Sequence, residues 1–168
     1  NDKTQLTVGF RNYDQDMDLT ASNGYYGAYL FGISNQNFKS SESGTIPKIN
    51  IKHNISDDIM VYGTYTEGFR PSGVNRLRPT DPAPKTYDAD YLESLELGFK
   101  STMDDGKLVI NGAVYSMDWN DYQTTTYDLN LVAVAFVDNV GNAEITGMEL
   151  NILYALNDTT NLTFYYNG

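Results

Sequence analysis

The sequence predicts an all-β chain that forms part of an antiparallel transmembrane β-barrel, with about seven strands of a larger barrel present. Three observations lead to this fold class. Apolar residues recur at every second position over most of the chain, and no segment shows the 3.6-residue period of a helix. The connections between these segments alternate between short polar turns and long segments. Several segments are long enough to cross a bilayer as strands, which takes about 9 to 11 residues.

The first half of the chain contains three predicted strands. Residues 5–12 carry Leu6 and Val8 at alternate positions, with polar residues between them. Residues 47–55 show the same pattern, and residues 59–69 are rich in tyrosine and end in Gly-Phe-Arg. Period-2 alternation of this kind is typical of a strand that is covered by apolar material on one face only.

The second half of the chain contains the remaining predicted strands. In residues 91–101, leucines and a phenylalanine occupy alternate positions. Residues 107–123 and 136–155 are continuous extended patterns, longer than the about 5 or 6 residues of a typical globular strand. A seventh strand begins at residue 161.

The lengths of the connections favour one kind of barrel. The short turns are expected at residues 56–58, 103–106 and 157–159, and the long segments at residues 13–43, 71–90 and 124–131. Outer-membrane barrels have short turns at one end and long loops at the other. Bacterial barrels of this kind have an even number of strands, from about 8 upward. We therefore expect residues 1–168 to be a fragment of a larger barrel.

Composition excludes several classes of function. The net charge is −11, which opposes binding to nucleic acid. The chain has no cysteine and a single histidine, His53, so neither a zinc cluster nor a thiol nucleophile is expected. The acidic run 14–18 begins like a calcium loop, but Leu19 and Tyr25 occupy positions that require glycine and glutamate. We expect no catalytic residues, no metal site and no cofactor.

Four segments resemble the TonB-dependent outer-membrane receptors. The matching segments are VYGTYTEGFRP at 61–71, YLESLELGFKS at 91–101, the residues 108–123, and NVGNAEITGMEL at 139–150. They occur in the order that the family has, and the resemblance covers roughly residues 45 to 155.

The resemblance implies the C-terminal part of a plugged barrel in the outer membrane of a Gram-negative bacterium. Such receptors take up scarce nutrients, for example ferric siderophores or cobalamin, with energy delivered by the TonB complex. We expect the plug domain and the TonB box to be absent from these 168 residues. The implied partners are outer-membrane lipid, lipopolysaccharide, a small-molecule ligand, and the TonB complex through the N-terminal part. No nucleic-acid partner is expected.

The alternation also predicts which residues face lipid and which face the lumen. Residues expected to contact lipid are Leu95, Leu97, Phe99, Leu150 and Ile152. Residues expected to face the lumen are Glu96, Lys100, Glu149 and Asn151. These polar residues would contact ligand or plug, or they face inward only because the lipid side must be apolar. Both faces of residues 108–119 mix polar and apolar residues, so no face is assigned there.

Two groups of residues are candidates for ligand binding. Arg70, Arg76 and Arg78 lie within nine residues, in a segment that holds four of the five prolines. Guanidinium groups bind carboxylate or phosphate, which suits an anionic chelate. The alternative is that the arginines pair with Asp81, Asp88 or Asp90, or bind lipopolysaccharide. Tyr25 and Tyr26 would stack on a ligand or be buried within their own loop.

The sequence thus favours a receptor for TonB-energised uptake without catalysis. Two alternatives stay open at this point. A passive porin-type channel shares the strand pattern and differs in lacking a plug. A soluble all-β binding module would need polar residues on the outer face, where Leu95, Leu97 and Phe99 stand.

Overall fold

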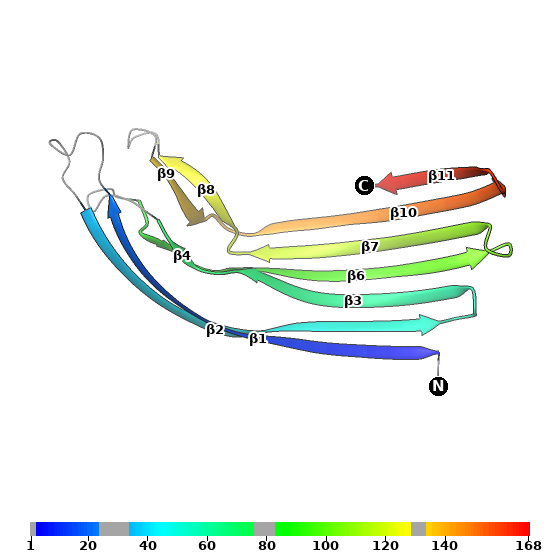
Figure 1. The fold of residues 1–168 in the computed structure, drawn as a ribbon, viewed down its shortest axis with the longest axis horizontal. Coiled ribbons are helices and arrows are strands. Elements are labelled where there is room, and N and C mark those ends of the chain that lie inside the picture. Colours follow the sequence, from blue (N-terminus) through cyan, green and yellow to red (C-terminus); the bar gives the residue numbers. More distant parts are fainter. Residues whose placement is uncertain (1–2, 24–33, 76–82, 129–133) are drawn as a thin grey trace.

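The computed structural model describes residues 3–23, 34–75, 83–128 and 134–168. Seven strands form one antiparallel sheet in which strands that follow one another pair as neighbours (Figure 1). These strands are β1 (Thr4–Asn23), β2 (Ser34–Asn54), β3 (Ile59–Arg70), β6 (Asp90–Met103), β7 (Leu108–Asn120), β10 (Ala143–Asn157) and β11 (Thr160–Asn167). The all-β prediction, with seven strands in an antiparallel sheet, is confirmed. No helix in the described part of the chain is long and apolar enough to span a membrane.

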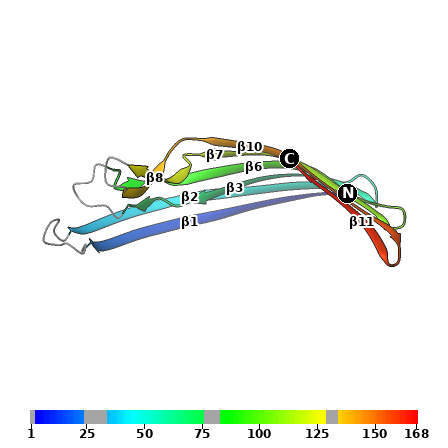
Figure 2. The ribbon, with the colours of Figure 1, turned by 90° about the horizontal axis from the view of Figure 1, so that it is seen from above.

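Four short strands lie outside the main sheet and form two small hairpins. They are β4 (Gly73–Val74) with β5 (Thr86–Tyr87), and β8 (Gln123–Asp128) with β9 (Val134–Asn139). Both hairpins lie at the end of the sheet opposite the short turns (Figure 1). The strands of the main sheet bow along their length, as the second view shows (Figure 2).

The short turns occur where the sequence predicts them. The turn between β6 and β7 places Asp104 and Asp105 at φ values of 54° and 53°, and Gly106 at 87°. Aspartate and glycine tolerate this left-handed region better than other residues. This composition therefore permits a tight reversal between two long strands.

The first long segment differs from the expectation. Residues 13–43 were expected as a connection, but β1 continues to Asn23 and β2 begins at Ser34. The two strands stay in register from Thr4↔His53 to Asn23↔Ser34. From about residue 13 of β1 onward, the half-exposed side chains are of mixed kinds, for example Gln15 and Met17. The alternation of apolar and polar residues is therefore weak there, although the strand continues.

Two of the predicted strands are each split into two shorter strands in the structure. The strand expected over 107–123 ends at Asn120, and Asp121 follows with φ 55°. The strand expected over 136–155 is interrupted after β9, where Gly141 has φ 125°. A left-handed residue turns the chain out of the sheet, so each long pattern becomes a sheet strand and a strand of the β8–β9 hairpin.

Pairing in the sheet separates the side chains into two faces. One row across six strands consists of Leu6, Ile51, Gly63, Leu97, Val114 and Met148. The adjacent row on the opposite face consists of Thr7, Asn50, Thr64, Glu96, Tyr115 and Gly147. Residues paired across antiparallel strands point to the same side, so one face is apolar and the other polar.

The register also places β7, for which no face was assigned. Val114 pairs with Leu97 and therefore lies on the apolar face, whereas Tyr115 pairs with Glu96 on the polar face. No register shift occurs in this pairing. The mixed composition of β7 therefore does not reflect a bulge in the ladder.

Candidate functional site

The polar face carries the first group of candidate residues. Glu96, Lys100, Glu149 and Asn151 lie on this face, opposite to Leu95, Leu97, Phe99, Leu150 and Ile152. Lys100, Glu149 and Asn151 line one hollow of about 550 Å³ on β3, β6, β7, β10 and β11. The structure thus brings three of these four residues around one hollow, which Tyr62 also lines.

Glu96 is connected to that hollow through Tyr62. The Tyr62 hydroxyl donates a hydrogen bond of 2.7 Å to Oε1 of Glu96. The ammonium of Lys100 lies 5.9 Å from the centre of the Tyr62 ring, within the range of a cation–π contact. Tyr62 is a residue that the sequence analysis did not single out, because a tyrosine on a Tyr-rich strand carries no distinguishing local signal.

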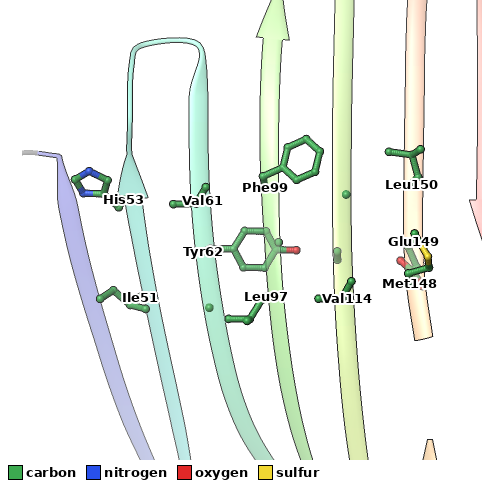
Figure 3. Close-up of a pocket in the computed structure, with 14 residues that line it drawn as sticks. Ile51, His53, Val61, Tyr62, Leu97, Phe99, Val114, Met148, Glu149 and Leu150 are labelled. Carbon is green, nitrogen blue, oxygen red and sulfur yellow. The ribbon is translucent and has the colours of Figure 1, made fainter. Parts of the chain in front are cut away.

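The apolar face contains a hollow of about 650 Å³. Its lining is predominantly apolar and comes from β2, β3, β6, β7 and β10, with Ile51, Val61, Leu97, Phe99 and Val114 among the side chains (Figure 3). Leu97 and Val114 are about half exposed. An apolar surface of this extent suits contact with lipid chains rather than a polar ligand.

A second group of polar residues gathers at the end of the sheet near the two small hairpins. Asp90 opens β6, and its side chain is 1% exposed. It forms an ion pair with Arg70, whose Nε lies 3.0 Å from both carboxylate oxygens and whose Nη2 also bonds to Oδ2. Asp90 Oδ2 accepts two further hydrogen bonds of 3.0 Å, from Nε1 of Trp119 and from the backbone N–H of Gln123.

The electrostatics of Asp90 follow from these partners. Burial opposes its ionisation, but the hydrogen bonds from Arg70 and from the Gln123 backbone outweigh this, so the pKa of Asp90 is lowered. The guanidinium of Arg70 also lies 4.9 Å from the ring centre of Trp119 and 5.5 Å from that of Tyr122. We call the residues Arg70, Asp90, Trp119 and Gln123 the strand-end cluster.

An aromatic stack lies at the same end of the sheet. The rings of Tyr13 and Phe69 stack with centres 4.0 Å apart, and the ring of Tyr91 lies 6.3 Å from that of Phe69. The Tyr13 and Tyr91 hydroxyl oxygens are 3.4 Å apart. This hydrogen bond, together with burial, raises the pKa of Tyr13 to about 12. The stack joins β1, β3 and β6, and on β1 it lies past Phe10, where the alternating apolar residues Leu6, Val8 and Phe10 end.

The predicted ligand-binding residues are only partly described by the structure. Arg70 is held by Asp90, which is one of the alternatives that the sequence left open, and its side chain is 46% exposed. Arg76 and Arg78 lie outside the described residues, as do Tyr25 and Tyr26. The role of all five residues in binding a ligand stays a prediction.

Asp90 was predictable from the sequence as a partner of an arginine, whereas Trp119 and Gln123 were not predicted to belong to this cluster. Gln123 was placed at the end of a strand, whereas its side chain donates to the backbone carbonyls of Pro71 and Asp88 at 3.0 and 2.8 Å. These contacts span 52 and 35 residues, so no local pattern reports them. Within the described ranges, no group of three or more histidine, cysteine, aspartate or glutamate side chains could hold a metal ion.

A long antiparallel sheet with one apolar face, one polar face and short turns at one end defines the wall of a membrane-spanning β-barrel. A family model described as TonB dependent receptor-like, beta-barrel matches residues 1–168. The chain belongs to this family of outer-membrane receptors, which places it in the outer membrane of a Gram-negative bacterium.

Individual relatives agree with this assignment. The pesticin receptor of Yersinia enterocolitica is 25% identical over 130 residues, covering 77% of this chain and 19% of that protein. The ferric yersiniabactin uptake receptor FyuA from Yersinia pestis has a similar fold, with a TM-score of 0.80 at 18% identity over 99% of this chain and 24% of that one. The copper transporter OprC has a TM-score of 0.70 at 14% identity, over 99% of this chain and 27% of its own. The chain spans about a fifth of the length of the curated relatives it matches.

Proposed function

We propose that the polar face of the sheet lines the lumen of a barrel that takes up a scarce nutrient across the outer membrane. The nutrient is a metal chelate such as a ferric siderophore, or cobalamin, and the energy is delivered through TonB. The protein performs no catalysis in this proposal. The observation that carries it is the separation of the faces, with Glu96, Lys100 and Glu149 on one side and Leu97 and Phe99 on the other.

Two findings support the choice of nutrient. The family consists of TonB-dependent receptors, and one protein of similar fold is a ferric yersiniabactin uptake receptor. The strand-end cluster and the aromatic stack together supply aromatic rings and hydrogen-bonding groups at the end of the sheet with the long connections. Planar rings and polar groups of this kind suit a chelate with aromatic or carbonyl donors.

The three arginines Arg70, Arg76 and Arg78 extend this proposal. Arg70 is engaged by Asp90, so a ligand would contact its exposed part only. Arg76 and Arg78 would supply two further guanidinium groups, a chemistry that suits an anionic chelate. Changing each of the three singly to Gln in the full receptor tests this role by titration of the transported chelate. Three variants that bind as tightly as wild type would assign these arginines to structure or to lipopolysaccharide.

Uptake of radioactive iron chelates tests the proposal as a whole. Cells that lack their own receptors and express the full-length protein should accumulate at least one chelate, and accumulation should cease when TonB is deleted. The matched control is the same strain carrying an empty vector. Accumulation that is independent of TonB and proportional to external concentration would identify a passive channel instead.

A further inference from the structure

The two long connections at one end of the sheet hold each other through asparagine side chains. The first connection is residues 71–89, between β3 and β6, and the second is residues 121–142, between β7 and β10. The β4 strand of the first and the β8–β9 hairpin of the second lie at the same end of the sheet (Figure 1). Among the described residues of the two connections, two asparagine side chains bind across at separate points.

At the first point, Asn75 of the first connection binds Val137 of the second. Its Oδ1 accepts a hydrogen bond of 2.8 Å from the Val137 N–H, and its Nδ2 donates one of 2.7 Å to the Val137 carbonyl. Nδ2 also donates to the Pro84 carbonyl at 3.1 Å. Asn75 is 6% exposed, so water does not readily replace these partners.

At the second point the roles of the two connections are exchanged. Asn139 of the second connection accepts a hydrogen bond of 2.8 Å on Oδ1 from the Asp88 N–H, and its Nδ2 donates one of 3.1 Å to the Asp88 carbonyl. Nδ2 also donates to the Asp121 carbonyl at 2.6 Å. Each connection therefore contributes one asparagine that binds both backbone groups of one residue in the other.

A side-chain amide has one acceptor and two donors, so it can pair with a peptide group as a neighbouring strand would. One such pairing would leave the partners free to pivot about it. Two pairings at separate points restrict that rotation, and Gln123 adds a third link through its bonds to the Pro71 and Asp88 carbonyls. The linked residues lie far apart in the sequence. The separation is 62 positions for Asn75 and Val137, 51 for Asn139 and Asp88, and 35 and 52 for the two bonds of Gln123.

We propose that the described parts of the two connections, residues 71–75 and 83–89 of the first and 121–128 and 134–142 of the second, form one rigid body. Asn75 and Asn139 are the positioning residues that hold these parts together. Any movement at this end of the barrel then shifts both connections at once. The inference concerns the motion of the protein itself and does not depend on which ligand is transported. Its failure would leave the proposed uptake function unaffected, and the reverse also holds.

Replacing asparagine by aspartate tests these links between the two connections, because the two side chains have nearly the same shape. A carboxylate keeps the acceptor but lacks the donor, and at position 75 it would face the carbonyls of Val137 and Pro84. Asn75→Asp and Asn139→Asp should therefore release the connections. The matched control is Asn142→Asp, because the side-chain hydrogen bond that Asn142 forms within the described residues is on its Oδ1, which accepts from the Asp121 N–H at 3.1 Å. A carboxylate keeps that acceptor.

The distance between spin labels in the full-length receptor, held in nanodiscs, reports the coupling directly. This chain has no cysteine of its own, and labels at the exposed positions Thr86 and Tyr127 lie one on each connection. Wild type and Asn142→Asp should give one narrow distance distribution. The double variant Asn75→Asp/Asn139→Asp should give a broad one, while its heat-dependent gel mobility shows that the barrel is folded.

Hydrogen exchange supplies a second measurement that does not need the double variant. Asn139→Ala removes the acceptor of the Asp88 N–H, so that amide in the other connection should exchange roughly fivefold faster. A broad label distribution in wild type would overturn the proposal. So would a distribution that stays narrow in the double variant, or an unchanged Asp88 exchange rate in Asn139→Ala.

Discussion

The Tyr62 hydroxyl donates a 2.7 Å hydrogen bond to Glu96, and the ring that carries this hydroxyl covers Gly98 on the neighbouring strand. A Cβ at position 98 would lie 2.6 Å from the Cζ and hydroxyl oxygen of Tyr62. Only glycine at this position lets the ring lie flat on the sheet. The glycine therefore determines where the tyrosine can bind the carboxylate.

Gly98→Ala should displace the Tyr62 ring and weaken its bond to Glu96. The expected loss in the free energy of unfolding is about 1 kcal/mol, the usual contribution of such a bond. The matched control is Gly68→Ala on β3, because a Cβ at position 68 meets no heavy atom within 4 Å. Urea unfolding in lipid vesicles measures both. If Gly98→Ala and Gly68→Ala are equally stable, the Tyr62 ring can move aside without a loss in the free energy of unfolding.

Arginine substitutions test which face meets lipid. Leu97 lies in the middle of the apolar row and is 55% exposed, so Leu97→Arg should cost about 2 to 4 kcal/mol in a bilayer. Ser94 lies on the polar face, opposite Thr66 and Met117, so Ser94→Arg should be tolerated. Folding yield into vesicles is the measurement. A barrel that accepts Leu97→Arg and rejects Ser94→Arg would have the opposite orientation.

Asp90→Asn should loosen the strand-end cluster. In wild type, Oδ2 of Asp90 accepts hydrogen bonds from Arg70, Trp119 and the Gln123 backbone. An asparagine side chain has an NH₂ group in place of one carboxylate oxygen, and this group cannot accept from these donors. We expect a loss of about 1 to 3 kcal/mol, below the cost of breaking a fully buried pair because the Arg70 side chain is 46% exposed and can rehydrate. Limited proteolysis in residues 71–89 and 121–142 should become faster.

The control for that substitution is Asp57→Asn, which changes an exposed carboxylate in the turn at the other end of the sheet. Proteolysis of the long connections should be unaffected by it. If Asp90→Asn leaves the cleavage rate at the wild-type value, the cluster does not hold the connections in place.

The same carboxylate predicts how stability depends on pH. The folded-state pKa of Asp90 is lowered from its ordinary value, so its contribution is complete above about pH 4, the unfolded-state value. The contribution is lost as the pH falls below that value and through the lowered folded-state pKa. Thermal unfolding at several pH values should therefore show a smaller acid-induced loss in Asp90→Asn than in wild type. Parallel curves for the two proteins would contradict this assignment.

The faces of the sheet could be predicted from the sequence because the side-chain period of a strand is a local property. Leu95, Leu97 and Phe99 lie on the side opposite to Glu96, as their alternation indicates. The turn at Asp104, Asp105 and Gly106 was equally predictable, because few residues adopt positive φ values. The outer part of β1 and β2 was not predictable, since a strand without apolar cover on one face lacks the alternation that identifies it.

By itself, the sequence determined the short turns and the separation of an apolar from a polar face of the sheet, because each depends on residues adjacent in the chain. Only the tertiary structure decided that Asn75 meets Val137 and that Asn139 meets Asp88, 62 and 51 residues away. It also decided that Arg70 is held by Asp90 rather than left free. The physical reason is that a polar side chain in a loop has many partners of equal chemistry, and the register of the strands beneath selects which one lies within hydrogen-bonding distance.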